Sequence, residues 1–164
     1  MPPGVTEGVY TKIEDKVLAV LAADADIAAS VKTFDAEGVK LAEDYNTHEL
    51  PALIVQADGG TGEWVTTGHR EETYQLFVDV IAEAGSTKRR RRAAKDIAAD
   101  IQLLLPREAD ADQLNGLDLV IPSADPGSIQ VSWRGTEVVD NAGSSTYRAV
   151  ARVQFDLSVD ILEV

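Results

Sequence analysis

The sequence predicts an α+β fold, in which two main helices pack on one face of an antiparallel sheet that includes a long C-terminal strand. The clearest observation is the strand itself. From Thr146 to Leu162 apolar and polar side chains alternate, and only Val150 and Leu162 interrupt the polar positions. Successive side chains of a strand point to opposite faces, so this alternation is typical of a half-buried strand. Because usual strands have about 5–6 residues, we expect this one to span a large sheet or to reach beyond its own subunit.

Two stretches have the spacing of amphipathic helices. The first is Tyr10–Ala22, where apolar side chains recur every three or four residues. The second begins at a capping residue, Ser86 or Thr87, and runs to about Leu105, where Pro106 is expected to close it. Its apolar stripe suits packing on a sheet and consists of Ala94, Ile97, Ala98, Ile101, Leu104 and Leu105.

Shorter apolar runs predict the remaining strands. These runs are Pro51–Ala57, Glu72–Ala82, Leu117–Ile121 and Ser128–Trp133. The second has apolar side chains on both faces, which favours a central position. We expect Gly59–Gly62 to turn the chain between the first two strands, and Asp140–Ser145 to turn it between Gln130–Val139 and the terminal strand. Segment 35–49 is interpreted as surface loops with a brief strand or helical turn, and the order of elements indicates α+β.

Composition limits the classes of protein to consider. The 164 residues are expected to form a single domain over 1–164, with a core of aliphatic side chains because aromatics make up only 5%. The sequence contains no cysteine, which excludes disulfides, thiolate catalysis and cysteine-based metal sites. The net charge of −13 disfavours nucleic-acid binding by the surface as a whole. We expect neither a membrane span nor a secretory signal.

A run of five cations, Lys88, Arg89, Arg90, Arg91 and Arg92, is the most unusual local feature. It holds a third of the fifteen cations and lies at the start of the second predicted helix. Exposed cations there oppose the helix dipole, at a cost of roughly 0.3–1 kcal/mol each. One interpretation is contact with an acidic neighbouring subunit or with passing nucleic acid. The other is a solvated cluster that the chain's own acids neutralise, with these candidates: Glu71, Glu72, Glu83 and Asp96. Arginine suits bidentate interface pairs, which favours a protein contact.

The polar face of the terminal strand has an order of its own. Arg148 and Arg152 come first, and Asp156 and Asp160 follow, each four residues after the last. A strand with this charge order can pair head to tail with a copy of itself. The alternative is an ordinary solvated face, since single surface ion pairs contribute only about 0–1 kcal/mol.

No motif in the sequence predicts catalysis, a metal or a cofactor. Gly59–Gly62 lacks the Lys-Ser/Thr and the helix start of a phosphate-binding loop. His48 and His69 have no metal-like spacing, and there is no Gly-x-Ser-x-Gly elbow. The sequence has two pairs of closely spaced aspartates, Asp24 with Asp26 and Asp110 with Asp112. Neither pair lies in a complete calcium-binding loop. Two tryptophans either anchor an interface or fill the core, namely Trp64 and Trp133. We therefore expect a protein that is not an enzyme.

Two short stretches carry a resemblance to a known family. They are Ile13–Leu21 (IEDKVLAVL) and Leu50–Gly60 (LPALIVQADGG). The strand Tyr74–Val80, the helix Ala93–Leu105 and the alternating terminal strand follow in the expected order. In these features the chain resembles the phage tail-terminator, or tail-completion, proteins of the Mu-type prophage family.

The resemblance implies structural work in a virion at the junction of tail and neck, after assembly in the host bacterial cytoplasm. Such proteins form a hexameric ring on the end of the tail tube, stop its polymerisation and face the neck or head-completion proteins. DNA passes through the lumen without specific binding, and no membrane is involved. Two other functions stay open: another connector, such as a head–tail joining protein, and a small nucleic-acid-binding module that uses Lys88–Arg92.

Overall fold

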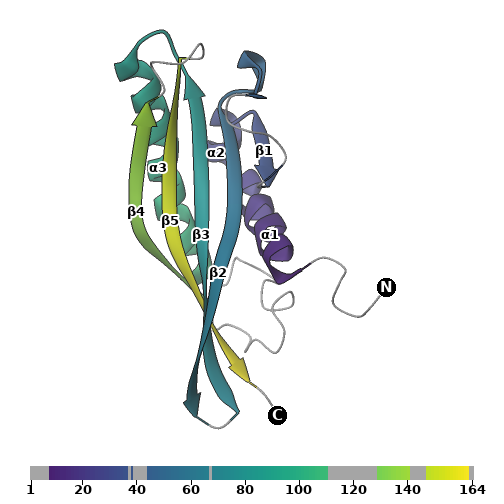
Figure 1. Cartoon of the computed structure of the whole chain (residues 1–164). Coiled ribbons are helices and arrows are strands. Elements are labelled where there is room, and N and C mark those ends of the chain that lie inside the picture. The colour runs from purple at the N-terminus through teal and green to yellow at the C-terminus, as the bar shows by residue number, and fades with distance from the viewer. Residues whose placement is uncertain are drawn as a thin grey trace.

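A long twisted sheet with helices on one face forms the molecule (Figure 1). The computed structural model describes residues 8–36, 38, 44–66, 68–110, 129–140 and 147–162. The described strands are β1 (Thr33–Ala36), β2 (Ala52–Thr66), β3 (His69–Glu83), β4 (Gln130–Asp140) and β5 (Arg148–Leu162). The described helices are α1 (Val9–Ala23), α2 (Ala25–Ser30), α3 (Thr87–Asp110) and the short 3₁₀ turn η2 (Thr47–Glu49).

The strand order is β1-β2-β3-β5-β4, which places β3 and β5 inside the sheet. Neighbouring strands run antiparallel, except that β1 pairs with β2 in parallel. The predicted α+β class is therefore confirmed, with one parallel pair at the edge of an otherwise antiparallel sheet. The predicted hairpin of Gln130–Val139 with the terminal strand is also confirmed, as β4 and β5, and it absorbs the separate strand that we expected at Ser128–Trp133.

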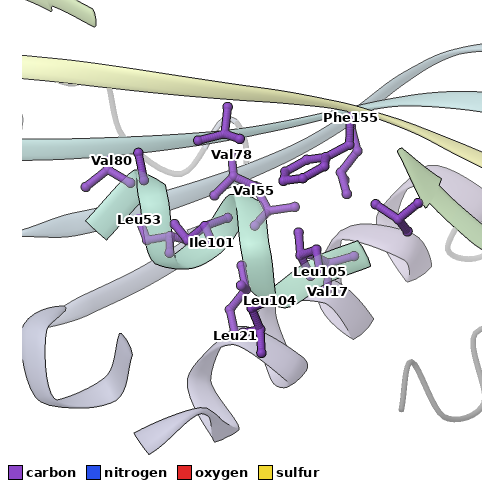
Figure 2. Close-up of a cluster of buried hydrophobic side chains, with 14 of the residues drawn as sticks. Val17, Leu21, Leu53, Val55, Val78, Val80, Ile101, Leu104, Leu105 and Phe155 are labelled. Carbon is purple, nitrogen blue, oxygen red and sulfur yellow. The ribbon is translucent and has the colours of Figure 1, made fainter. Parts of the chain in front are cut away.

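Both main helices contribute to one core against the sheet. Side chains of α1 and α3, among them Val17, Leu21 and Ile101, meet those of β2, β3 and β5 (Figure 2). The odd positions of β5 from Ala149 to Ile161 are at most 1% exposed, which confirms this part of the predicted buried face of the terminal strand. Tyr147, the first residue expected on that face, precedes β5 and is 57% exposed. The apolar alternation thus reports directly which face meets the helices.

Asp24 separates the first two helices. The first predicted helix, Tyr10–Ala22, is confirmed as α1, and the apolar residues after it form the short α2. The Asp24 carboxylate accepts hydrogen bonds from the backbone N–H groups of Asp26 and Ile27, each at 3.1 Å. This is the usual role of aspartate at a helix N-cap, so the acidic pair Asp24/Asp26 has a structural function.

The glycine-rich stretch does not turn the chain, contrary to our expectation. β2 continues to Thr66, and the hairpin with β3 turns near Gly68. A β-bulge lies between Asp58 and Thr61, where Gly59 has a φ of 53°. A Cβ on Gly60 would lie 2.7 Å from the hydroxyl of Tyr10, whose oxygen accepts the Gly60 N–H. The glycines therefore allow a bulge and a close approach of the first helix, which local turn propensity does not reveal.

Pro106 does not end its helix, which is a second correction. α3 continues to Asp110 with the proline inside it. Proline removes one backbone donor but keeps a φ that a helix accepts. The buried side chains just before it, Leu104 and Leu105, hold the helix against the sheet at that point. The strand predicted at Leu117–Ile121 lies outside the described residues.

A smaller apolar cluster covers one end of the opposite face of the sheet, which we call the outer face. Tyr45 and Leu50 pack there against Ala52 and Ile81. Segment 44–50, expected as loop with a helical turn, includes η2 and forms this cover. Most of the rest of the outer face is polar, as is common for antiparallel sheets that are packed on one side, and the ring of Phe77 lies beneath Arg152 there.

Candidate subunit-interface surfaces

The cationic run begins α3, and Ser86 caps that helix. The Ser86 hydroxyl accepts the backbone N–H of Arg89 at 3.3 Å, and the Ser86 carbonyl accepts that of Arg90 at 3.1 Å. The five cations then separate by helical geometry. Lys88, Arg89 and Arg92 are exposed, Arg91 is half-buried, and Arg90 is buried.

Arg90 forms an ion pair inside the subunit. Its Nε and Nη2 donate to the two carboxylate oxygens of Asp140 at 2.5 and 3.0 Å, and Nη2 also donates to Thr87 Oγ1 at 2.7 Å. The guanidinium lies 5.7 Å from the ring centre of Tyr147. The hydrogen bond raises the pKa of Arg90 and lowers that of Asp140 below its ordinary value. The pair joins the start of α3 to the end of β4.

Asp140 was not among the acids expected to neutralise the run. Two of the expected acids pair elsewhere, Glu72 with Arg70 and Glu83 with Arg148. Sequence reasoning missed Asp140 because it follows Arg90 by 50 residues and enters the prediction only as part of a turn. Its place at the end of a strand of the β4–β5 hairpin is the signal that relates it to α3.

The remaining cations form what we call the basic strip: Lys88, Arg91, Arg92 and Lys95. These side chains share one face of α3 and, with Asp96, line a surface hollow of about 380 Å³. Arg91 donates to the carbonyl of Val138 at 3.4 Å. Within the described part of the chain, none of the four forms an ion pair with a carboxylate. Their charge is therefore available to a partner.

Both arginines of β5 have partners in their own chain. Arg148 is 4% exposed, donates to Glu83 at 3.2 Å and also donates to the carbonyl of Tyr45. Arg152 forms a bidentate pair with Asp79 at 2.8 and 2.9 Å. Arg148 thus holds the outer-face cover in place, whereas Arg152 remains at the surface.

The aspartates of β5 are paired as well. Arg134 donates to Asp156 at 2.5 Å, and His69 Nε2 lies 3.5 Å from Asp160. Because β5 lies between β3 and β4, its backbone from Ala149 to Ser158 is paired on both sides. This part of the strand cannot pair with a copy through its backbone, and contact with a copy through the charged outer face stays a prediction.

The opposite end of the sheet carries carboxylates on three neighbouring strands. Glu63 of β2 lies opposite Glu71 of β3, which lies opposite Asp160 of β5, so three carboxylates stand in a row across three strands. We call them the carboxylate row. Trp64 and Val65 follow Glu63 along β2 and are 59% and 58% exposed, and the guanidinium of Arg70 lies 5.6 Å from the Trp64 ring centre. We call Glu63–Val65 together with His69–Glu71 the hairpin end.

Trp64 and Trp133 are both exposed, so neither fills the core. His48 lies in η2, and His69 faces Asp160. No group of His, Asp and Glu in the described ranges could hold a metal ion. The side chain of Asp110 and all of Asp112 lie outside the described part.

A similar fold occurs in a chain of one solved virion structure. No protein-family model and no curated protein matches the chain. A chain in the solved structure of the virion of a native gene transfer agent (GTA) particle is similar, with a TM-score of 0.55 and 18% sequence identity. The match covers 90% of this chain and 93% of that one. The two chains share a fold.

None of the helices in the described ranges has the length and apolar character needed to cross a membrane.

Proposed function

We propose that this protein is a structural, non-enzymatic component of a virion, and specifically a tail terminator. It forms a homo-oligomeric ring on the end of the tail tube, stops tube polymerisation and meets the neck or head-completion proteins. The observation that carries the proposal is a fold shared, over nearly the whole length of both chains, with a chain of a gene transfer agent virion. The resemblance of Ile13–Leu21 and Leu50–Gly60 to tail terminators supplies the place in the particle and the hexameric state.

The distribution of charge supports assembly into a ring. A closed ring needs two different surfaces on each copy, because each subunit contacts its neighbours in a head-to-tail sense. The basic strip and the hairpin end are two such surfaces, and they differ in charge. The net charge of −13 suits a conduit through which DNA slides without being held.

The predicted interface residues take different roles in this proposal. Lys88, Arg89, Arg91 and Arg92 are available for contact between subunits, whereas Arg90 and Arg148 stabilise the subunit from inside. Three residues on the outer face contribute at the surface: Arg152, Asp156 and Asp160.

Electron microscopy of particles made with and without the gene tests the proposal. We expect the gene-deleted preparation to contain tails of irregular length that are not joined to heads, and expression of the wild-type protein to restore joined tails of uniform length. Native mass spectrometry of the purified protein should show a defined multiple of the subunit mass. A strict monomer that is absent from the virion would refute the proposal.

Two alternatives are separable by experiment. If the protein is labelled in electron micrographs of the particle, the label should lie on the head side of the neck for a head–tail joining protein and on the end of the tube for a tail terminator. The unpaired basic strip favours the third candidate, a nucleic-acid-binding module. With four phosphate contacts, the logarithm of its binding constant should fall with the logarithm of salt concentration with a slope of roughly −3 to −4. Absence of DNA binding near physiological salt would exclude this candidate.

A further inference from the structure

We infer that the hairpin end of one copy docks on the basic strip of a second copy, so that subunits join head to tail through these two surfaces. The inference rests on the proposed ring function and names the contact that builds it. Both surfaces belong to the described residues. Glu63 and Glu71 on one surface, and the four cations of the basic strip on the other, form no ion pair with a described residue.

Each surface is unfavourable in an isolated subunit. Like charges directly opposite each other on neighbouring strands are destabilising, and the carboxylate row places three in line. His69 lies near one end of the row, at Asp160, while Glu63 and Glu71 form no ion pair with any described residue. On α3, cations beside the positive end of the helix dipole repel both the dipole and one another. A contact between the two surfaces would relieve both.

The two surfaces cannot meet within one chain. The hairpin end lies at the start of β3 and the basic strip follows its end, at opposite ends of the sheet (Figure 1). Twelve residues of β3, from Glu72 to Glu83, separate them, a span of roughly 40 Å at about 3.3 Å per residue. The screening length at physiological salt is only about 8 Å. Their complementarity can therefore act only between copies.

Shape and apolar character also favour a second copy as the occupant. The hairpin end extends past the helices (Figure 1) and carries the exposed Trp64 and Val65. Trp64 lies opposite Arg70, on the face of the sheet away from the carboxylate row. Tryptophan is enriched at the centres of protein interfaces, and the guanidinium of Arg70 in the same chain already lies 5.6 Å from the centre of the Trp64 ring. The hollow among the basic strip offers both ammonium and guanidinium groups and their alkyl stems. Nucleic acid would satisfy the cations but not the carboxylates or the apolar tip.

Charge-reversal variants of the full chain test the contact. The first variant, E63K/E71K, makes the hairpin end positive, and the second, K88E/R92E, makes the basic strip negative. Each alone should assemble at least about tenfold more weakly than the wild type, because like charges would face each other. An equimolar mixture of the two, and a single chain carrying all four changes, should regain wild-type assembly because opposite charges again meet.

Sedimentation at physiological salt measures assembly, and circular dichroism verifies that each variant folds. The matched control is D15K/D100K, which alters net charge as much as E63K/E71K does but at exposed sites of α1 and α3 outside both surfaces; it should assemble normally. Wild-type assembly by E63K/E71K, or no recovery in the mixture, would overturn the inference and leave the proposed function standing. Loss of DNA binding without loss of assembly in K88E/R92E would assign the strip to nucleic acid and would also overturn it. A wild-type monomer absent from the virion would instead refute the proposed function.

Discussion

Removing the carboxylate of Glu14 should destabilise the fold far more than removing an exposed acid from the same helix. Glu14 lies on α1 and is only 8% exposed. Its Oε2 accepts the backbone N–H of Ala57 in β2 at 2.8 Å. β1 pairs with β2 only as far as Val55, so the edge of β2 beyond that residue needs another partner. Glu14 supplies one from the helix layer.

The size of the effect follows from this bond. A hydrogen bond to a charged group contributes about 1.5–3 kcal/mol, and a buried N–H left without a partner costs about 1–3 kcal/mol. We therefore expect Glu14→Ala to lower the free energy of unfolding by roughly 2–3 kcal/mol, which for a chain of this size lowers the thermal midpoint by about 4–12 °C. Glu14→Gln keeps an oxygen acceptor and should lose about 1 kcal/mol, since only the charge is removed.

Urea unfolding followed by circular dichroism measures the loss. All variants are compared at one subunit concentration, because assembly adds stability that depends on concentration. Asp15→Ala is the matched control, since Asp15 is the exposed neighbour on α1 and its removal should change stability by less than about 0.5 kcal/mol. Equal stability of Glu14→Ala and Asp15→Ala would refute the reasoning.

Three further changes test other parts of the structure. Asp140→Asn should reduce stability at neutral pH. Because the pKa of Asp140 is lowered in the folded state, the stability that its carboxylate contributes is complete above the unfolded pKa of about 3.9 and is lost as the pH falls through the folded pKa. In urea titrations below about pH 4, the free energy of unfolding of the variant should therefore vary less with pH than that of the wild type. Gly60→Ala should cost roughly 1–3 kcal/mol in urea unfolding, since its Cβ would meet the Tyr10 hydroxyl, whereas Gly85→Ala has open space and should change little. Pro106→Ala should raise the thermal midpoint, because it restores a backbone donor inside a helix at a gain of up to about 3 kcal/mol, and an unchanged midpoint would contradict this.

Periodicity predicted the parts of the fold whose burial it reflects. The alternation after Thr146 identified β5 and its buried face, and three-and-four spacing identified α1 and the packed stripe of α3. In each case the pattern is imposed by the environment of the side chains, so the sequence carries it directly. The central position of β3 followed in the same way from apolar residues on both of its faces.

The two wrong boundaries came from residues whose local preference the tertiary structure overrides. Gly59 and Gly60 favour a turn in isolation, but here they permit a bulge and the approach of Tyr10. Pro106 disfavours a helix, yet α3 continues through it. Local propensity is a weak guide where neighbouring elements pack on the same residues.

The candidate surfaces required the register of the sheet. The carboxylate row becomes visible only when Glu63, Glu71 and Asp160 are aligned across three strands, and no sequence spacing relates them. Likewise, the five-cation run appears uniform in the sequence, whereas the structure separates the internal Arg90 from the exposed Lys88 and Arg92. Pairings over such distances along the chain depend on which strands are neighbours.

The charges of the outer face also indicate where assembly contacts belong. In the middle of that face the cations and carboxylates neutralise each other, as in the pairs Arg152–Asp79 and Arg134–Asp156. Two other places lack this balance: carboxylates gather at the hairpin end, and cations gather on the helix side of the molecule, along the start of α3. Scattered negative charge is enough to keep an acidic chain soluble. Solubility therefore does not explain the separate basic strip. Charge separated in this way between the two ends of one subunit favours directional contact between copies, which a ring requires and a solitary subunit does not.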